Sequence, residues 1–398
     1  MAPRRRRRAA SGPLACVMGD IDLVMPIALA GLRCAAVADA GDPVHYSRFT
    51  ERTVEAVDQW TRGGELVDRL LALAAAEPAP PVLFYQTDGD LLVVSRQRDR
   101  LAEGFRFVVP EARLVEDLVD KSRFQALAGE IGLPVPASRH VEPAAGDLGD
   151  VDPPFPLVVK PLSRAFPAWL AVEEDAKAIR VDGRDDLARL WPRLAAEGLT
   201  VLLQELIPGD ERRIESHHAY VDADGEIAAE FTGRKIRTYP PEFGHSTAVE
   251  TTRVADVTEL GREVLRRLGL RGVAKVDFKR GPDGRLHLLE VNPRFSLWHY
   301  VGALAGVNIP AVVHADLTGA PRPPRRPVRE GVTWCRPWPD RLAARAAGVP
   351  MRRWLGSALR AEAKAGMRWD DPLVFALGKV WPRVAARAGL PLPGASRT

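Results

Sequence analysis

One short apolar strand pattern in this sequence carries both a carboxylate and an amide: Leu286-His287-Leu288-Leu289-Glu290-Val291-Asn292-Pro293-Arg294. Residues two apart on a strand point the same way, so Glu290 and Asn292 share one face, and Pro293 stops the strand. A carboxylate beside an amide oxygen suits a hard cation such as Mg²⁺ that also holds phosphate oxygens. An ordinary surface strand with its polar groups in water explains the pair equally well.

A second acidic strand precedes this one at Ala274-Lys275-Val276-Asp277-Phe278. The Gly281-Pro282-Asp283-Gly284 turn between the two predicts a β-hairpin. Near-symmetric pairing about that turn would place Asp277 across from Glu290. The hairpin therefore predicts three oxygen-bearing side chains that converge on one point.

Lysine is rare among the 56 basic residues, with only eight lysines in the chain. Lys160 ends the strand 157–161 and precedes a proline, which presents its ammonium from a fixed backbone. Lys235 and Arg237 share a face of the next basic strand pattern. Either basic cluster alone is more typical of surface charge. Together with the acidic hairpin they indicate phosphates held by lysines and a metal, as in phosphoryl transfer.

Several common catalytic motifs are missing from the sequence. It has no G-x-x-x-x-G-K-[ST] phosphate loop, no H-E-x-x-H and no G-x-S-x-G. The adjacent His217 and His218 would point to opposite faces of a strand. Residues 13–40 predict a β-α-β start without the dinucleotide fingerprint, and a helix is predicted over Val54–Ala76. Asp88 follows the strand pattern 80–85, where it would either cap a helix or face a ligand.

Composition indicates a globular protein of two or three domains. The chain has 398 residues, 46% of them hydrophobic, and a formal net charge of +4. No apolar run reaches the ~20 residues that span a bilayer, and no signal peptide is recognised. The three scattered cysteines indicate a cytoplasmic protein without a structural metal site. Basic residues are interspersed with acids, which argues against nucleic acid as a partner.

Six motifs in order resemble the ATP-grasp enzymes, in particular the bacterial carboxylate–amine ligases of the D-aspartate ligase type. They are Asp120-Lys121, Val158-Val159-Lys160-Pro161, Leu203-Gln204-Glu205-Leu206-Ile207-Pro208-Gly209, Gly233-Arg234-Lys235-Ile236-Arg237, Val276-Asp277-Phe278 and Glu290-Val291-Asn292-Pro293-Arg294. The resemblance implies a mixed α/β and α+β fold, in which a Rossmann-like pre-ATP-grasp domain precedes a two-subdomain ATP-grasp fold. The implied boundaries are the first domain at 13–118 and subdomains at 119–203 and 204–320. Composition predicts a basic tail at 1–12 and a separate carboxyl-terminal region at 321–398.

The resemblance also implies site residues. Lys121 and Lys160 would contact ATP phosphates, Gln204, Glu205, Leu206 and Ile207 would form the hinge that holds adenine, and Glu211 would bind the ribose. Asp277, Glu290 and Asn292 would ligate Mg²⁺, or Mn²⁺ in its place. Lys235, Lys275 and Arg294 would serve the γ-phosphate and an acylphosphate. Many members have a glycine-rich loop after the residue that corresponds to Lys160, whereas this chain has none, so Arg164 or another lid would serve the phosphates.

The implied reaction activates a small-molecule carboxylate as an acylphosphate and joins it to an amine, with release of ADP and phosphate. A carboxylase, a kinase, an acid–thiol ligase or a non-catalytic nucleotide-binding protein are the alternatives. Substrate selectivity would lie in the amino-terminal unit and the 237–251 segment, with Glu242, His245 and Glu250. The tryptophan-bearing basic segments after residue 331 would cover a domain core, or less readily lie on a membrane surface.

Overall fold

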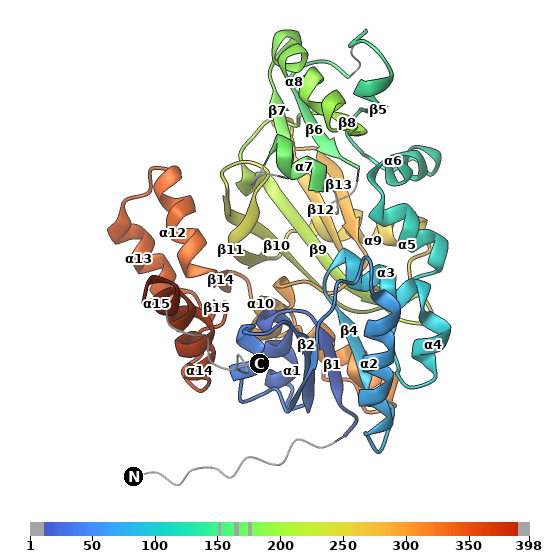
Figure 1. Cartoon of the computed structure of the whole chain (residues 1–398), viewed down its shortest axis with the longest axis vertical. Coiled ribbons are helices and arrows are strands. Elements are labelled where there is room, and N and C mark those ends of the chain that lie inside the picture. Colours follow the sequence, from blue (N-terminus) through green and yellow to red (C-terminus); the bar gives the residue numbers. More distant parts are fainter. Residues whose placement is uncertain (1–11, 150–152, 163–166, 174–176, 389–398) are drawn as a thin grey trace.

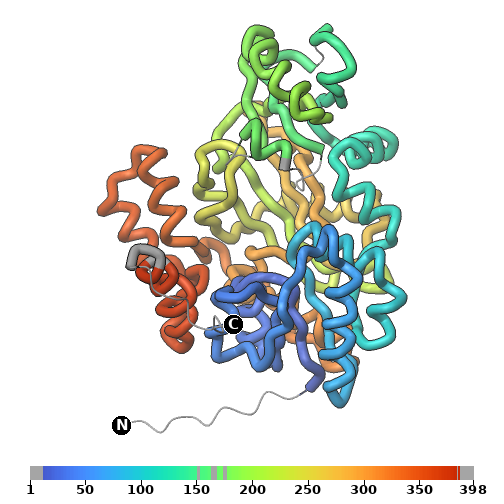
Figure 2. The backbone as a smooth tube through the Cα atoms, in the orientation of Figure 1, coloured from blue at the N-terminus to red at the C-terminus, as the bar shows by residue number. Residues whose placement is uncertain are grey.

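The computed structural model describes residues 12–149, 153–162, 167–173 and 177–388. Its strands form three sheets, two with four strands and one with seven. Figures 1 and 2 show the sheet of β5 to β8 at one end of the long axis and the amino-terminal sheet at the other. The seven-stranded sheet therefore lies between the two smaller ones.

The amino-terminal sheet is parallel, with the strand order β3-β2-β1-β4. Its inner strands are runs of apolar residues that are almost entirely buried, because helices cover both faces of such a sheet. Asp20 caps the first helix by accepting a hydrogen bond from the amide of Asp22 at 2.9 Å. The predicted β-α-β start is confirmed. The elements are β1 (Ala15–Met18), α1 (Ile21–Leu29), β2 (Cys34–Ala38), a 3-10 turn (Pro43–Tyr46), β3 (Arg52–Glu55), α2 (Gly63–Ala75), β4 (Val82–Tyr85), α3 (Asp88–Arg96) and α4 (Arg98–Ala102).

The helix predicted over Val54–Ala76 is wrong in its first third. Val54 lies in β3 and pairs with Val37 of β2, and α2 begins only at Gly63. β3 is an edge strand of four residues in which only Val54 is buried. So short an alternation was masked by the helical period of the residues that follow it.

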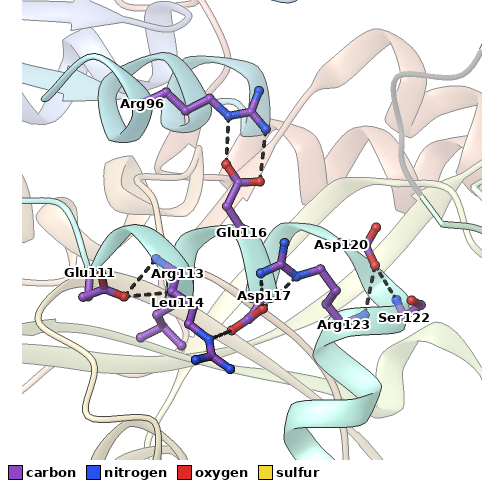
Figure 3. A network of polar contacts seen from close by, with 9 residues as sticks. All are labelled: Arg96, Glu111, Arg113, Leu114, Glu116, Asp117, Asp120, Ser122 and Arg123. Atoms are coloured by element: carbon purple, nitrogen blue, oxygen red, sulfur yellow. Dashed lines mark hydrogen bonds and ion pairs between the residues drawn. The ribbon is translucent and has the colours of Figure 1, made fainter.

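Two short helices connect the amino-terminal sheet to the rest of the molecule, α5 (Ala112–Val119) and α6 (Lys121–Glu130). The carboxylate of Asp120 accepts hydrogen bonds from the amides of Ser122 and Arg123, each at 2.9 Å, so the predicted helix cap is confirmed (Figure 3). Glu116 receives two hydrogen bonds from Arg96, at 2.8 and 3.0 Å, which tie α5 to α3. These contacts fix the positions of α5 and α6 relative to the amino-terminal sheet.

The small sheet has the order β5-β8-β6-β7 and is antiparallel throughout. Its core consists of apolar side chains from the strands and from two helices that pack on them, with Leu157, Val159 and Leu203 fully buried or nearly so. Lys160, next to the end of β6, is thus presented by a rigid strand. The elements are β5 (Ser138–Val141), a 3-10 turn (Pro143–Ala145), β6 (Leu157–Pro161), α7 (Pro167–Val172), β7 (Ile179–Val181), α8 (Arg184–Ala196) and β8 (Val201–Glu205).

The large sheet has the order β13-β12-β9-β10-β11-β14-β15 and contains the predicted acidic hairpin as β12 and β13. One of its faces packs on α9 and, from the preceding segment, on Phe124 and Ala128 of α6. The other face carries the polar residues of interest. The elements are a 3-10 turn (Glu211–Arg213), β9 (Ile214–Val221), β10 (Ile227–Tyr239), β11 (His245–Thr252), α9 (Ala255–Arg267), β12 (Gly272–Arg280), β13 (Leu286–Asn292), α10 (Trp298–Leu304) and α11 (Ile309–Thr318).

The carboxyl-terminal region adds two strands to this same sheet. β14 pairs with β11, so the expected boundary at residue 320 does not coincide with an edge of the sheet. Trp334 of β14 is fully buried, and its indole donates a hydrogen bond to Asp22 Oδ1 of α1 at 3.1 Å. The elements are β14 (Thr333–Cys335), α12 (Pro337–Ala346), α13 (Met351–Arg360), β15 (Ala363–Lys364), α14 (Pro372–Phe375), a π-helical turn (Ala376–Val380) and α15 (Trp381–Ala388).

A buried carboxylate fastens α12 to the large sheet. Asp340 has no exposed surface and receives two hydrogen bonds from Arg237 of β10, both at 2.7 Å. Thr247 of β11 and the indole of Trp354 each donate a further one, both at 2.9 Å. The carboxylate is thereby fully satisfied, as a buried charge must be.

Within the described ranges, no single helix has the length and apolar character needed to cross a membrane. In this described part of the chain, only α10 and α11 taken together reach that threshold, across a bend of 89°.

Candidate functional site

A cavity of about 460 Å³ lies where the small sheet faces the large one, at the end toward the amino-terminal sheet. It is lined from all three parts of the molecule. Eight of the residues singled out in the sequence line it: Lys121, Lys160, Gln204, Glu211, Lys235, Asp277, Glu290 and Asn292. Segments as far apart as α6 and β13 thus converge on one space.

The predicted hairpin register is confirmed. Asp277 pairs with Glu290 and Lys275 pairs with Asn292, next to a bulge between Asp277 and Phe278. Paired residues of an antiparallel ladder point to the same face. The two carboxylates, the amide and the Lys275 ammonium are therefore neighbours.

Asp277 is almost fully buried, and both of its oxygens have partners. Its carboxylate accepts one hydrogen bond from the Ser216 hydroxyl and one from the Lys275 ammonium. Lys275 also lies over the ring of Trp298, 5.5 Å from its centre. Burial lowers the pKa of Lys275, and the carboxylates of Asp277 and Glu290 oppose that shift. The Lys275 ammonium thus neutralises part of the negative charge of the acidic hairpin.

Arg294 connects the hairpin to the amino-terminal sheet. Its guanidinium donates to Asn292 Oδ1 at 3.1 Å, to Asp88 Oδ1 at 2.5 Å and to the Gln86 carbonyl at 2.9 Å. Asp88 begins α3 at the carboxyl end of β4 and lines the cavity, where a strand-end acid in a parallel sheet faces a ligand. Arg294 itself lies just behind the cavity wall, as does Lys275.

Three of the four lysines that line the cavity make the following contacts within the chain. Lys121 donates to the carbonyl of Pro161 at 2.7 Å, and Lys160 donates to Gln204 Oε1 at 2.6 Å. Lys235 pairs with Glu211 at 3.3 Å. The Nε2 atom of Gln204 is buried and finds no acceptor in the part of the chain that the structure describes. This wall of the cavity therefore offers both positive charge and an unused N–H donor.

The expected hinge lies beside the cavity rather than wholly in it. Leu206 and Ile207 line a smaller adjoining space of about 160 Å³, which they share with Glu211. The amides of Glu205 and Leu206 already donate to the carbonyls of Ala137 and Pro156, at 2.8 and 3.1 Å. Of the segment 204–207, only Gln204 lines the larger cavity. Arg164 lies outside the described residues.

The two adjacent histidines point to opposite faces, as predicted. His217 Nε2 lies 2.9 Å from the Glu230 carboxylate, to which it donates, while His218 stacks on Phe231 with ring centres 4.4 Å apart. His218 pairs with Lys275 in the ladder between β9 and β12, and His299 approaches it from α10. Burial lowers the pKa of His299 to about 3 and holds that of His218 well below its ordinary value. Neutral imidazoles therefore form the layer beneath Lys275.

Several cavity residues were not found in the sequence. Trp60 and Trp169 line the cavity without any local pattern that marks them. Lys177 also lines it, and its only signal was the rarity of lysine in an arginine-rich chain. Of the three residues expected to set selectivity, His245 lines the cavity, Glu250 pairs with Arg234 at 2.6 Å, and Glu242 lies near Arg180 at 3.4 Å.

The oxygen atoms of the hairpin have the chemistry of a magnesium site. Two carboxylates and an amide are hard oxygen donors, which Mg²⁺ prefers and usually supplements with phosphate oxygens and water. No group of three or more His, Cys, Asp or Glu side chains within the described part of the chain could hold a metal. A metal here would therefore depend on Asn292 and on phosphate oxygens as well as on the two acids.

Comparison with known proteins agrees with this arrangement. The family model "ATP-grasp in the biosynthetic pathway with Ter operon" matches residues 199–335. The D-aspartate ligase of Enterococcus faecium (strain Aus0004) is 24% identical over 300 residues, 72% of this chain and 71% of that protein. The D-alanine–D-alanine ligase of Halorhodospira halophila (strain DSM 244 / SL1) is 29% identical over 189 residues, 44% of this chain and 56% of that protein.

Solved structures share the fold at low sequence identity. An L-amino acid ligase from Bacillus licheniformis superposes with a TM-score of 0.59 at 16% identity, over 79% of this chain and 75% of that one. An ADP complex of N5-carboxyaminoimidazole ribonucleotide synthetase superposes with a TM-score of 0.60 at 14% identity, over 80% of each chain. The predicted fold class is confirmed. The chain has the fold of ATP-grasp proteins and resembles the carboxylate–amine ligases among them.

Proposed function

We propose that this protein is an ATP-dependent ligase that joins a small-molecule carboxylate to an amine and releases ADP and phosphate. The observation that carries the proposal is the single cavity that gathers Lys121, Lys160 and Lys235 opposite the oxygen atoms of the β12–β13 hairpin. Relatives named as D-aspartate and D-alanine–D-alanine ligases support the choice of carboxylate–amine ligation among ATP-grasp reactions.

In this proposal the nucleotide lies across the cavity with its phosphates toward the lysines. Lys121 and Lys160 would bind phosphate oxygens, and Glu211 would accept hydrogen bonds from the ribose. The segment 204–207 would contact adenine, with Gln204 Nε2 as a donor that has no acceptor among the described residues. Asp277, Glu290 and Asn292 would hold Mg²⁺ or Mn²⁺, which when bound neutralises phosphate charge.

The proposed reaction needs no covalent nucleophile from the protein. A carboxylate oxygen of the substrate attacks the γ-phosphorus as the bond to ADP breaks. The amine nitrogen then attacks the acyl carbon, loses a proton and expels phosphate. Lys235, Lys275 and Arg294 would stabilise the charge on the transferred phosphoryl group, so the contribution of the protein is positioning and electrostatics.

We also propose the division of the chain that this function implies. Residues 13–118 would be the pre-ATP-grasp domain, with Trp60 and Asp88 as its contacts in the cavity. Residues 119–203 and 204–320 would be the two ATP-grasp subdomains, and 321–398 would be a carboxyl-terminal region that shares the large sheet.

The products of the reaction test the proposed route directly. Amino acids supplied in pairs with ATP and Mg²⁺ should release ADP and inorganic phosphate in equal amounts for the correct pair. Phosphate release and chromatography of the nucleotides would measure both. AMP and pyrophosphate as products would reject the acylphosphate route.

Replacement of Lys160 by methionine should weaken ATP binding by about 10- to 100-fold, because a charge-assisted contact to phosphate is lost. Titration calorimetry with a non-hydrolysable ATP analogue measures this change without turnover. Lys364→Met is the matched control, because Lys364 donates to backbone carbonyls in the carboxyl-terminal region. Equal affinities of Lys160→Met and wild type would remove Lys160 from the phosphate site.

A further inference from the structure

Exposed apolar side chains of this protein are concentrated in its carboxyl-terminal helices. Of the twelve large hydrophobic residues that are exposed within the described ranges, nine lie between residues 338 and 384. Figure 1 shows α12 to α15 together on one flank of the molecule, apart from the small sheet. The nine are Trp338, Met351, Leu355, Leu359, Trp369, Leu373, Phe375, Val380 and Val384. Such a concentration marks an interaction surface.

α13 carries the clearest part of this surface. Met351, Leu355 and Leu359 follow one another at intervals of four residues and form a stripe along one side of the helix. They are 37%, 51% and 69% exposed, whereas Ala358, which borders the stripe on the side of Met351, is buried. The helix therefore packs on the protein along one edge of the stripe and presents the rest of the stripe to solvent.

The helix that carries this stripe also carries positive charge that the protein does not neutralise. Residues 337–360 contain five arginines and a single acid, Asp340, which is buried and paired with Arg237. Arg352, Arg353 and Arg360 are exposed, and their guanidinium groups have no hydrogen-bond or ion-pair partner within the described residues. Elsewhere in the chain exposed arginines commonly pair with acids, as Arg329 does with Glu362. The guanidinium groups of α13 are therefore available to anions.

We propose that the outer face of α12 and α13 binds the surface of an anionic lipid bilayer. A bilayer of this kind supplies both partners that the face lacks: acyl chains for the Met351-Leu355-Leu359 stripe and phosphates for Arg352, Arg353 and Arg360. The ten residues of α13 span about 15 Å, which suits a helix that lies in the plane of the interface.

Charge disfavours the other occupants of this face. Two copies packed through it would bring unpaired arginines of one against those of the other, which is repulsive. A nucleic acid would match the arginines but offers no apolar counterpart to an aliphatic stripe. The anionic bilayer is the occupant that satisfies both halves of the surface.

Sedimentation of the full chain with vesicles tests this proposal. The protein should bind vesicles of phosphatidylcholine and phosphatidylglycerol in equal parts, should not bind phosphatidylcholine alone, and should bind less at high salt. Leu355→Glu with Leu359→Glu, and separately Arg352→Gln with Arg353→Gln, should each weaken partitioning about tenfold or more. Both pairs change exposed side chains, so the thermal unfolding midpoint should stay close to that of wild type.

The matched control is Leu29→Glu with Arg113→Gln, two exposed residues that lie outside α12 to α15, and it should bind as wild type does. Replacement of the basic run Arg4 to Arg8 by glutamine should also leave binding largely intact. Absence of wild-type binding to the anionic vesicles, or binding that the α13 variants do not alter, would overturn the proposal. So would a dimer in light scattering that the leucine variants dissociate, since the face would then belong to a second copy.

Discussion

Glu290→Gln is expected to lower the rate of ADP release by about a thousandfold or more while the fold persists. The substitution keeps the size of the side chain but removes one of the two negative charges that face the proposed metal and phosphates. Because Glu290 lies in β13 opposite Asp277, no other acid of the hairpin can take its place. Steady-state ADP release and the thermal unfolding midpoint should be measured together.

Glu116→Gln is the matched control for this variant. Glu116 pairs with Arg96 in a network away from the cavity, so its loss should leave turnover within about twofold of wild type (Figure 3). Turnover by a folded Glu290→Gln protein at the wild-type rate would reject the hairpin as the metal site. It would leave the ATP-grasp fold itself untouched.

Asp340→Ala is expected to lower the free energy of unfolding by about 3–5 kcal/mol. The carboxylate is fully buried, and its removal strands the Arg237 guanidinium together with the donors of Thr247 and Trp354. Leaving a buried guanidinium without its partner lowers the stability far more than the loss of a surface ion pair does. Urea unfolding followed by tryptophan fluorescence measures the loss.

Asp370→Ala provides the comparison, because its pair with Arg368 lies at the surface. That change should cost less than about 1 kcal/mol. A double variant, Asp340→Leu with Arg237→Met, should recover much of the stability by removing both charges at once. A loss below about 1 kcal/mol in Asp340→Ala would show that Arg237 finds another partner or water.

Local patterns allowed much of the site to be predicted. The turn at Gly281–Gly284 determined the register of the hairpin, and the cap at Asp120 determined where α6 begins. Both depend on residues close in sequence, which is why a single sequence suffices. The edge strand β3 was missed because four residues carry too little periodicity.

Long-range pairings could not be predicted. Arg237 and Asp340 are 103 positions apart, and nothing near either residue indicates the other. The same holds for β14, which joins the large sheet beside β11 through backbone hydrogen bonds that any apolar segment could make. Trp60 reaches the cavity only because the amino-terminal sheet packs against the hairpin through Arg294 and Asp88.

Ion pairs within the chain must be broken when ligands bind in the cavity. Lys275 holds Asp277, Lys235 holds Glu211, and Arg294 holds Asp88 and Asn292. Under the proposed function, a triphosphate that draws Lys275 toward its phosphates would free Asp277 to hold a divalent ion, and one that draws Lys235 would free Glu211 for the ribose. Nucleotide and metal are then thermodynamically linked, each raising the affinity of the other by the same factor.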